Sequence, residues 1–422
     1  MTATAPVRLQ DVAPPLDILP YGRPFIDDDD IAAVCAVLRS QWLTTGPAVE
    51  AFEAALAAEV GAADAVACAS GTAALHLACL ALGLGPGDGL IVPAITFAAT
   101  ANCARFVGAE AIFADVDPET GLMEAEHVAA AAGRAIRAGI RPRAVAPVHF
   151  AGQLVDLQGL RAQAADLDLA VVEDACHALG AAVDSEDGAV RGRVGACDDS
   201  VMTVFSFHPV KSVTMGEGGA VTTNDPALAR RLRDFRGHGI TRNPAAFADT
   251  AASRGADGRA NPWYYEMADI GFNYRASDIA CALGRSQLDK LAHFVASRRA
   301  IARRYESALA PLAPLFRPLA RCSGRAHAWH LYVVRIDFAA IGCDRATLMR
   351  SLAAVGIGSQ VHYIPLHRQP YYRRRYGEVF LPGAEQYYSR CLSLPLFVGL
   401  GDGDIQRIVR VLADTLATGC RP

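Results

Sequence analysis

The sequence predicts an α/β fold with a mainly parallel sheet in a large first domain, followed by a smaller C-terminal α+β domain. Short apolar runs alternate with helical patterns through the first 225 residues, which is typical of a parallel sheet with crossover helices. The chain has 422 residues, of which 52% are hydrophobic, so it can form two domains with a large buried core. We expect a flexible N-terminal arm over residues 1–17, a large domain over 18–260 and a small domain over 261–422.

The expected strands and helices follow one another in the order that a parallel sheet requires. Strands are expected at residues 65–68, 89–92, 111–114, 144–148, 169–172, 201–205 and 219–223, with helices at 72–82 and 98–106 between the first three. Residues 243–266, rich in Ala, Asp, Arg and Gly, predict a long loop, and such loops are often functional. The small domain is expected to contain two long helices within 276–310, strands at 331–336 and 359–363, and a helix near 344–355.

Composition excludes several classes of partner. The net charge of -4 and a pI near 6.3 give no basic footprint for nucleic acid. No apolar stretch is long enough to span a bilayer, and the first residues lack the features of a signal peptide. The 11 cysteines are scattered without a CxxC pair, which favours reduced thiols over zinc or disulfides. We therefore expect a cytoplasmic protein without a nucleic-acid, membrane or metal partner.

The sequence contains only two lysines, Lys211 and Lys290, among its 40 lysine and arginine residues. A lysine amine can lose its proton and attack a carbonyl, which an arginine side chain cannot do. Lys290 lies on the polar face of a helical pattern, where a solvated charge is expected. Lys211 lies between an apolar run and the glycine-rich residues 216–219. It is therefore a candidate for carbonyl chemistry, the alternative being an exposed loop lysine.

Polar residues directly follow three of the expected strands. Residues 70–73 (Ser-Gly-Thr-Ala) precede a helix, where free amides and the helix dipole favour a phosphate, although an ordinary N-cap is the alternative. Asp174 closes a strand and could pair with a protonated ring nitrogen or act as a capping residue. His177 could face the same site or be a core histidine. Ser206, five residues before Lys211, could donate a hydrogen bond to a phosphate.

Together these three segments predict a site for pyridoxal 5′-phosphate (PLP). This cofactor needs an amine for its aldehyde, an acid for its pyridinium and donors for its phosphate. The carboxyl ends of parallel strands meet at one edge of a sheet, where ligands bind in open α/β folds. We therefore expect the three segments to meet at one site.

The sequence resembles the DegT/StrS family of nucleotide-sugar aminotransferases, which are fold-type I PLP-dependent enzymes. The resemblance extends from Tyr21 to about Leu416. Its most specific motif is residues 206–211 (Ser-Phe-His-Pro-Val-Lys), followed by residues 216–219 (Gly-Glu-Gly-Gly). The aspartate motif at 173–180 and the segments at 93–97 and 271–275 also match.

The resemblance implies a role for each matching residue. Lys211 would bond to the cofactor, Asp174 would hold its pyridine nitrogen, and His177 and Phe97 would lie against its ring. The phosphate would be bound by Thr72, Ala73 and Ser206, with Asn273 reaching it from the partner subunit of a homodimer with shared active sites. Because relatives with histidine at the lysine position catalyse a dehydration, the retained Lys211 favours transamination.

The C-terminal half is similar to the branch that makes UDP-4-amino-4,6-dideoxy-N-acetyl-β-L-altrosamine in pseudaminic acid synthesis. The similarity lies in residues 263–266, 361–367 and 370–372, whereas 327–332 is shared with UDP-4-amino-4-deoxy-arabinose aminotransferases. It implies that glutamate aminates a UDP-linked 4-keto-6-deoxy sugar. A UDP-4-keto-pentose or GDP-4-keto-6-deoxymannose stays open as the substrate.

The candidate substrate contacts are Arg23, Thr45, Arg275, His362 and Tyr363. A turn at the start of the domain is an equal alternative for the first two, and packing of the small domain is the alternative for the last two. A desulfurase would need a cysteine in a mobile exposed loop, which the sequence does not indicate. A non-catalytic binding protein is disfavoured by the intact Lys211 and Asp174.

Overall fold

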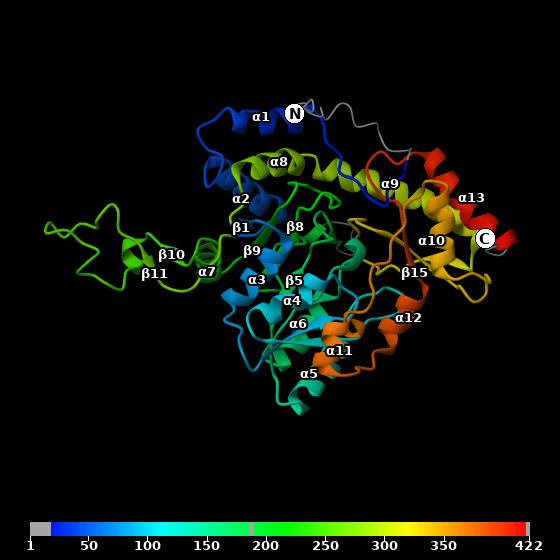
Figure 1. Cartoon of the computed structure of the whole chain (residues 1–422), viewed down its shortest axis with the longest axis horizontal. Coiled ribbons are helices and arrows are strands. Elements are labelled where there is room, and N and C mark those ends of the chain that lie inside the picture. Colours follow the sequence, from blue (N-terminus) through cyan, green and yellow to red (C-terminus); the bar gives the residue numbers. More distant parts are fainter. Residues whose placement is uncertain (1–17, 185–189, 419–422) are drawn as a thin grey trace, which may run out of the picture.

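The computed structural model describes residues 18–184 and 190–418. The N-terminal arm expected at residues 1–17 lies outside this range. Figure 1 shows an α/β body from which the segment containing β10 (Ile240–Thr241) and β11 (Glu266–Met267) extends to one side.

A seven-stranded sheet forms the centre of the large domain, in the order β1-β9-β8-β5-β4-β2-β3. Its strands are β1 (Asp64–Cys68), β2 (Asp88–Pro93), β3 (Glu110–Ala114), β4 (Arg141–Val145), β5 (Ala170–Asp174), β8 (Met202–Ser206) and β9 (Gly219–Thr223). The strands from β3 to β8 pair in parallel, and β9 is antiparallel to both neighbours. The expected mainly parallel sheet is confirmed. The strand β9 reverses direction because a loop, rather than a crossover helix, connects it to β8.

Helices cover both faces of this sheet (Figure 1). One face packs against α3 (Gly71–Ala81), α4 (Ala98–Phe106) and α7 (Pro226–Arg236). The other packs against α5 (Ala125–Arg137) and α6 (Leu157–Asp166), and against α2 (Pro47–Val60) and α8 (Asp278–Leu288). Within β2, Leu90 and Val92 enter the first core while Ile91 enters the second, as the two-residue period of a strand requires.

The C-terminal region is built on a three-stranded antiparallel sheet of β12 (Phe316–Pro318), β14 (Tyr332–Ile336) and β15 (Cys391–Leu394). Its helices are α9 (Leu291–Leu309), α10 (Arg345–Ala354), α11 (Pro370–Tyr376), α12 (Pro382–Arg390) and α13 (Asp402–Thr418). The helix α8 and the start of α9 belong to a core cluster of the large sheet, while the rest of α9 packs on the small one. The domain boundary at residues 260 and 261 stays a prediction.

The expected strand at residues 359–363 is wrong. Only Gln360 pairs there, in a single bridge to Ser393 on β15. Pro365 has no N–H to continue a ladder, and the Leu366 N–H donates to Ala94 O in the large domain. The chain therefore leaves the small sheet and crosses to the edge of the large one.

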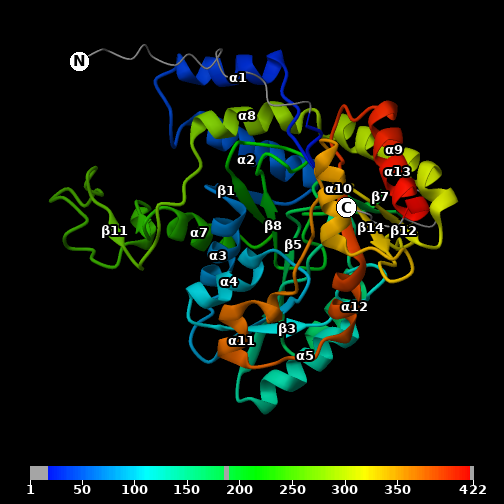
Figure 2. The ribbon, with the colours of Figure 1, turned by 45° about the vertical axis from the view of Figure 1, so that its right-hand side comes forward.

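The remaining elements are short. They are α1 (Asp28–Leu38), the small sheet of β6 (Ala182–Asp184), β7 (Val190–Arg193) and β13 (Arg325–Ala326), and the 3-10 turns Phe150–Gly152, Pro244–Ala246, Ala310–Leu312 and Leu366–Arg368. Residues 243–266 are largely irregular, as expected, and both views show this segment extending away from the body (Figures 1 and 2). Its end exposes Trp263, Met267 and Ile270.

Nine cysteines are free thiols, as expected, but Cys343 is disulfide-bonded, so the expectation of reduced thiols is wrong at that position. Among the described residues, no helix is both long and apolar enough to cross a membrane.

Candidate active site

A cavity of about 670 Å³ opens at the carboxyl edge of β5 and β8. Two parts of the chain form it, namely the loops after these strands and the segment around residues 360–369. The structure brings together eight of the residues singled out from the sequence: Thr72, Phe97, Asp174, His177, Ser206, Lys211, His362 and Tyr363. The three polar segments expected at one sheet edge therefore do meet there.

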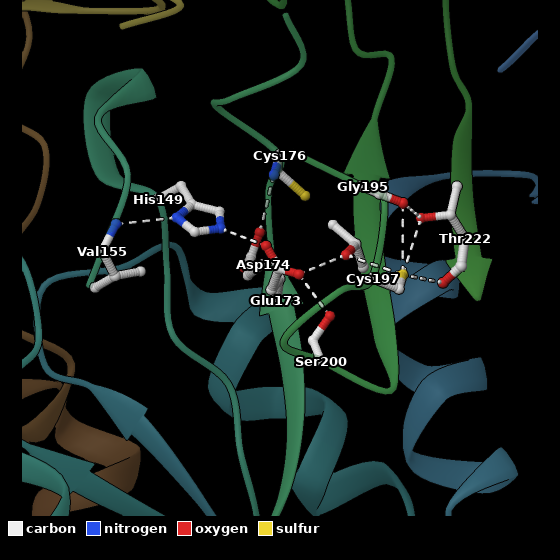
Figure 3. Close-up of polar contacts among 10 residues, drawn as sticks. His149, Val155, Glu173, Asp174, Cys176, Gly195, Cys197, Ser200 and Thr222 are labelled. Carbon is white, nitrogen blue, oxygen red and sulfur yellow. Dashed lines mark hydrogen bonds and ion pairs between the residues drawn. The ribbon is translucent and has the colours of Figure 1, made fainter. Parts of the chain in front are cut away.

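Asp174 is the buried carboxylate of this cavity. Its Oδ2 accepts a 2.7 Å hydrogen bond from Thr100 Oγ1. Its Oδ1 accepts one of 3.2 Å from the Cys176 N–H, which Figure 3 shows. Thr100 is itself 2.8 Å from Thr96 Oγ1. The carboxylate is thus fixed in orientation, and it still has acceptor capacity toward the cavity.

Lys211 lies in the loop between β8 and β9. Backbone hydrogen bonds from Phe207 to Gly218 and from Met215 to Phe207 close this loop, which holds the lysine at the sheet edge. Burial lowers the pKa of the Lys211 amine, and the nearby Cys176 and Asp174 only partly oppose this shift. A larger share of the amine is therefore neutral, the form that attacks a carbonyl or accepts a proton.

The other lysine has a structural partner. Lys290 forms ion pairs with Asp27 and Asp30 at the start of α1. The prediction that Lys290 carries a solvated charge is therefore wrong. Its amine connects the start of α1 to the junction of α8 and α9 through these ion pairs.

The N-terminus of α3 faces the cavity at residues 70–73. Ser70 caps the helix, since its Oγ accepts from the Ala73 N–H at 3.1 Å. Among the described residues, the N–H groups of Gly71 and Thr72 have no hydrogen-bond acceptor. The N-cap alternative is confirmed for Ser70, while the free amides beside it leave phosphate binding a prediction.

Two glycines allow this turn to approach the neighbouring strands. A Cβ at Gly71 would lie 2.7 Å from Ser206 Cβ, and one at Gly219 would lie 2.3 Å from Ser70 O. Only glycine allows such contacts. Ser206 therefore lies directly against the free amides, and the cluster of glycines in residues 216–219 has a packing reason at Gly219.

Two neutral histidines line the wall beside Lys211. His177 Nδ1 accepts from the Ala151 N–H at 3.3 Å, so its Nε2 carries the proton and donates to Tyr363 Oη at 3.2 Å. The His330 ring lies 4.3 Å from the His177 ring, and its Nε2 is 3.5 Å from Lys211 Nζ. Burial, followed by the Lys211 charge, lowers the pKa of both histidines well below the ordinary value. His330 was not singled out from the sequence, although the 327–332 motif contains it.

The C-terminal region also supplies His362 and Tyr363 to the cavity wall. His362 Nδ1 lies 2.8 Å from Ser393 Oγ on β15, and the Tyr387 hydroxyl donates to the His362 carbonyl. Burial lowers the pKa of His362 to about 3. Tyr363 extends toward Phe97, with ring centroids 6.2 Å apart. The segment that failed as a strand thus places two aromatic side chains in the cavity.

The other candidate residues lie outside this cavity of their own chain. Ala73 is buried, and its N–H is used by the Ser70 cap. Arg23 lies over the Phe397 ring at 4.5 Å. Thr45 and Arg275 line a separate cavity of about 370 Å³, and Asn273 is exposed beside its bridge to Gly237. Their roles stay predictions.

The residues present fit PLP. The cavity offers a partly neutral amine, a buried carboxylate with free acceptor capacity, and a helix N-terminus with unpaired amides beside Ser206. These are the three functions that the cofactor needs, and they come from separate segments of the chain. The fold and this site define a fold-type I PLP-dependent enzyme.

Comparison with known proteins identifies the family to which the chain belongs. The model of the DegT/DnrJ/EryC1/StrS aminotransferase family matches residues 24–413, and the chain belongs to this family. It is therefore a sugar aminotransferase that uses PLP.

Solved structures of similar proteins agree with this assignment. The Helicobacter pylori PseC, an aminotransferase involved in the biosynthesis of pseudoaminic acid, is 28% identical with a TM-score of 0.82, over 95% of this chain and 100% of that one. DesI, solved in the presence of its TDP-sugar product, is 32% identical with a TM-score of 0.81, over 96% and 94%. The PLP form of the putative sugar aminotransferase Spr1654 from Streptococcus pneumoniae is 26% identical with a TM-score of 0.80, over 96% and 100%.

Proposed function

We propose that this enzyme transfers the amino group of glutamate to the 4-keto carbon of a UDP-linked 4-keto-6-deoxy sugar, forming UDP-4-amino-4,6-dideoxy-N-acetyl-β-L-altrosamine. The observation that carries the proposal is that Lys211, Asp174 and the His362–Tyr363 segment share one cavity. The first two supply the transamination chemistry. The third comes from the part of the sequence that resembles the pseudaminic acid branch, and the similarity to PseC supports the same choice.

Each residue has a distinct task in this proposal. Bound PLP supplies an electron sink for the negative charge that develops on the donor carbon. Asp174 holds the ring nitrogen, and the amides of Gly71 and Thr72 hold the phosphate together with Ser206. The Lys211 amine takes the proton from the donor and returns it, a general base and then a general acid. Its lowered pKa places the proton exchange nearer to neutral pH.

The aromatic wall suits a sugar nucleotide. Phe97 is 59% exposed at the cavity, although it is a large apolar side chain. Tyr363 and Tyr21 add rings with polar tips to the same cavity. Such rings pack on the apolar face of a sugar or base while their hydroxyl groups bond to its polar edge.

A substrate panel tests the proposal directly. The purified holoenzyme is mixed with glutamate, and the loss of cofactor absorbance reports the first half-reaction. UDP-, TDP- and GDP-linked 4-keto sugars are then added in turn, and the amino sugar is identified by mass and by NMR. The UDP-linked 4-keto-6-deoxy N-acetyl sugar should restore the absorbance fastest. A clear preference for a TDP-linked sugar, the type of product present with DesI, would replace the proposed substrate.

We further propose that the active enzyme is a homodimer in which Asn273 and Arg275 reach the phosphate in the partner's cavity. Both residues lie outside the catalytic cavity of their own chain, since Asn273 bridges to Gly237 and Arg275 lines the separate cavity of about 370 Å³. Lys211→Ala chains and Asn273→Ala/Arg275→Ala chains should each be inactive but regain partial activity when mixed. Mixed dimers would then contain one site with an intact lysine and an intact loop. Verified subunit exchange without any return of activity would reject the shared site.

A further inference from the structure

A second cavity, of about 600 Å³, lies between α9, the end of β7 and the segment around β13, outside the catalytic site. The elements α9 and β7 lie on the same side of the molecule (Figure 2). Five arginines line it: Arg193, Arg299, Arg303, Arg321 and Arg325. Among the residues that the structure describes, Glu59 is its only acidic lining residue. No other cavity described above has such a charge excess.

Three of these arginines have carboxylate partners at the rim. Arg193 pairs with Glu59 at 2.6 Å, and Arg325 pairs with Asp156 at 3.0 Å. Arg321 pairs with Glu306. Their charges are therefore largely compensated.

Arg299 and Arg303 are different. Within the described part of the chain, neither guanidinium makes an ion pair or a side-chain hydrogen bond. They are one turn apart on α9, a spacing at which Cβ atoms lie about 5–6 Å apart and like charges destabilise a helix. A bound anion would offset this repulsion. Because a guanidinium binds phosphate oxygens with two parallel N–H donors, two neighbouring arginines match two adjacent phosphates.

The cavity also contains an aromatic surface with a fixed donor. His327 and Trp329 stack with ring centroids 4.1 Å apart. The backbone N–H of Trp329 donates to His327 Nδ1 at 2.7 Å, so a neutral His327 carries its proton on Nε2. Burial and the charges of Arg321 and Arg299 lower the pKa of His327 to about 3, which keeps it neutral. The cavity therefore offers an uncharged donor beside the arginines.

We propose that this basic cavity is a second ligand site, which binds a diphosphate group through Arg299 and Arg303. The diphosphate could be inorganic pyrophosphate or part of a nucleoside diphosphate, since both present the same two adjacent anions. A ligand of this size fits a cavity of the volume that small-molecule sites usually have.

The site is connected to the catalytic cavity by one peptide. Trp329 lines the basic cavity, and the next residue, His330, lies 3.5 Å from Lys211 Nζ. Trp329 adopts a φ of 55°, a left-handed conformation that is strained for a bulky residue. The buried Arg298 donates to the carbonyls of both residues and holds them in place. Binding in the basic cavity should therefore alter the position of His330 beside Lys211.

The binding experiment uses the PLP-loaded enzyme, so that the cofactor phosphate site is already filled. Pyrophosphate, UDP and inorganic phosphate are titrated by calorimetry into the wild type, into Arg299→Gln/Arg303→Gln and into Arg304→Gln. Arg304 is a matched control, because it lies on the same helix but pairs with Asp402 outside the cavity. We expect pyrophosphate to bind the wild type and the control alike, and the double variant at least about 10-fold more weakly, the size of one lost charge-assisted contact.

The arms separate the two ligand sources. UDP binding that the double variant weakens as much as pyrophosphate binding assigns the site to the diphosphate group of either source. UDP binding that is tighter than pyrophosphate binding and equally sensitive assigns it to nucleoside diphosphates. No saturable binding of pyrophosphate by the wild type, or pyrophosphate binding that the double variant leaves unchanged, would overturn the proposal. UDP binding that persists in the double variant is assigned to the catalytic cavity, where the proposed function places a UDP-linked sugar, and the pyrophosphate titration then decides.

A fluorescence measurement localises the ligand. The chain has three tryptophans, and Trp42 and Trp263 are exposed, whereas Trp329 is buried. In the Trp42→Phe/Trp263→Phe protein, emission from Trp329 should change saturably with pyrophosphate, and Arg299→Gln/Arg303→Gln should abolish this change. Unchanged emission under saturating ligand would contradict a site at this cavity. A change in KM or kcat with pyrophosphate that persists in the double variant would contradict the coupling, because it would indicate competition in the catalytic cavity.

Discussion

Two adjacent carboxylates at the end of β5, Glu173 and Asp174, have opposite surroundings (Figure 3). Both are buried, with exposed fractions of 2% and 4%. Glu173 accepts hydrogen bonds from His149 Nε2 at 2.8 Å and from Ser200 and Thr203. Asp174 accepts from one side chain, that of Thr100, and one backbone N–H, and it faces a cavity.

The difference follows from the strand and not from the residue types. Successive side chains of a strand point to opposite faces, so a single-residue step moves a carboxylate from a closed protein network to a ligand cavity. The Val155 N–H donates to His149 Nδ1, so a neutral His149 presents its Nε2 proton to Glu173. Glu173 is thus satisfied by the protein alone, whereas Asp174 retains capacity for a partner. We therefore propose that Glu173 supports the fold and Asp174 supports the chemistry.

The largest effect is expected on the Asp174 side, from Lys211→Ala. This variant should fold but lose transamination by about 10⁴-fold or more, because the general acid and base is removed. Borohydride reduction of the wild-type holoenzyme, followed by peptide mapping, should find the cofactor on Lys211. Cofactor on Lys290, or on no lysine, would contradict the assignment, and the ion pairs of Lys290 with Asp27 and Asp30 make it the natural control.

Asp174→Asn and Glu173→Gln provide the direct test of the comparison. Asp174→Asn should keep the cofactor bound but slow the glutamate half-reaction by roughly 100-fold or more, since an amide cannot hold a ring cation by charge. Glu173→Gln should leave the half-reaction within about 10-fold of the wild type and instead reduce stability. Single-turnover absorbance measures both rates. Equal rate losses in the two variants would contradict the proposal that Asp174 serves the reaction and Glu173 the fold.

A smaller effect is expected for Thr100→Val, which removes the hydroxyl bond to Asp174 while nearly preserving side-chain volume. Thr100 is fully buried, and it connects Asp174 to Thr96. Loss of one hydrogen bond to a charged group should slow the half-reaction by roughly 10–100-fold, the equivalent of about 1.5–3 kcal/mol. Thr203→Val, which removes the corresponding bond to Glu173, is the matched control and should leave the rate near that of the wild type. A rate loss as large for Thr203→Val as for Thr100→Val would contradict the separate roles proposed for Glu173 and Asp174.

The large domain was predictable because its signals are local. Most strands of the central sheet appear as short apolar runs, with Asp174 and Ser206 at the ends of two of them. The exception is β4 (Arg141–Val145), which begins with Arg-Pro-Arg, so the strand expected at 144–148 was placed three residues too late. Parallel pairing then requires their strand ends to meet at one edge. The residues near the ends of these strands are therefore the ones whose convergence at one cavity could be predicted from the sequence.

The rest depends on contacts between distant segments. His330 reaches Lys211 from 119 residues away in the sequence. Residues 359–363 have the composition of a strand, but the hydrogen bond from Leu366 to Ala94 diverts the chain into the cavity. The partner that fixes Lys290 belongs to α1, more than 250 residues earlier. No periodicity within a segment contains this information, because tertiary contacts decide it.

The smallest effect is expected on the pH dependence of the free energy of unfolding, and here it is the contribution of Glu173 that is tested. Burial would raise the pKa of this carboxyl, but the hydrogen bonds from His149, Ser200 and Thr203 outweigh burial and lower it below its ordinary value. A lowered pKa contributes stability above the unfolded value of about 4.3, and that contribution disappears as the pH falls through the folded value. Glu173→Gln should therefore be less stable than the wild type by about 1–3 kcal/mol at pH 7, with a smaller difference below pH 4.

Urea unfolding of both proteins between pH 7 and pH 3.5, followed by the fluorescence of the buried Trp329, measures this difference. The exposed Glu126→Gln is the control, since its side chain is 81% exposed and should show no such dependence. A gap between wild type and Glu173→Gln that stays constant down to pH 3.5 would mean that the carboxyl is not ionised in its network. Glu173 would then bind His149, Ser200 and Thr203 as a neutral acid. The difference between Glu173 and Asp174 would lie in their hydrogen-bond partners and not in charge.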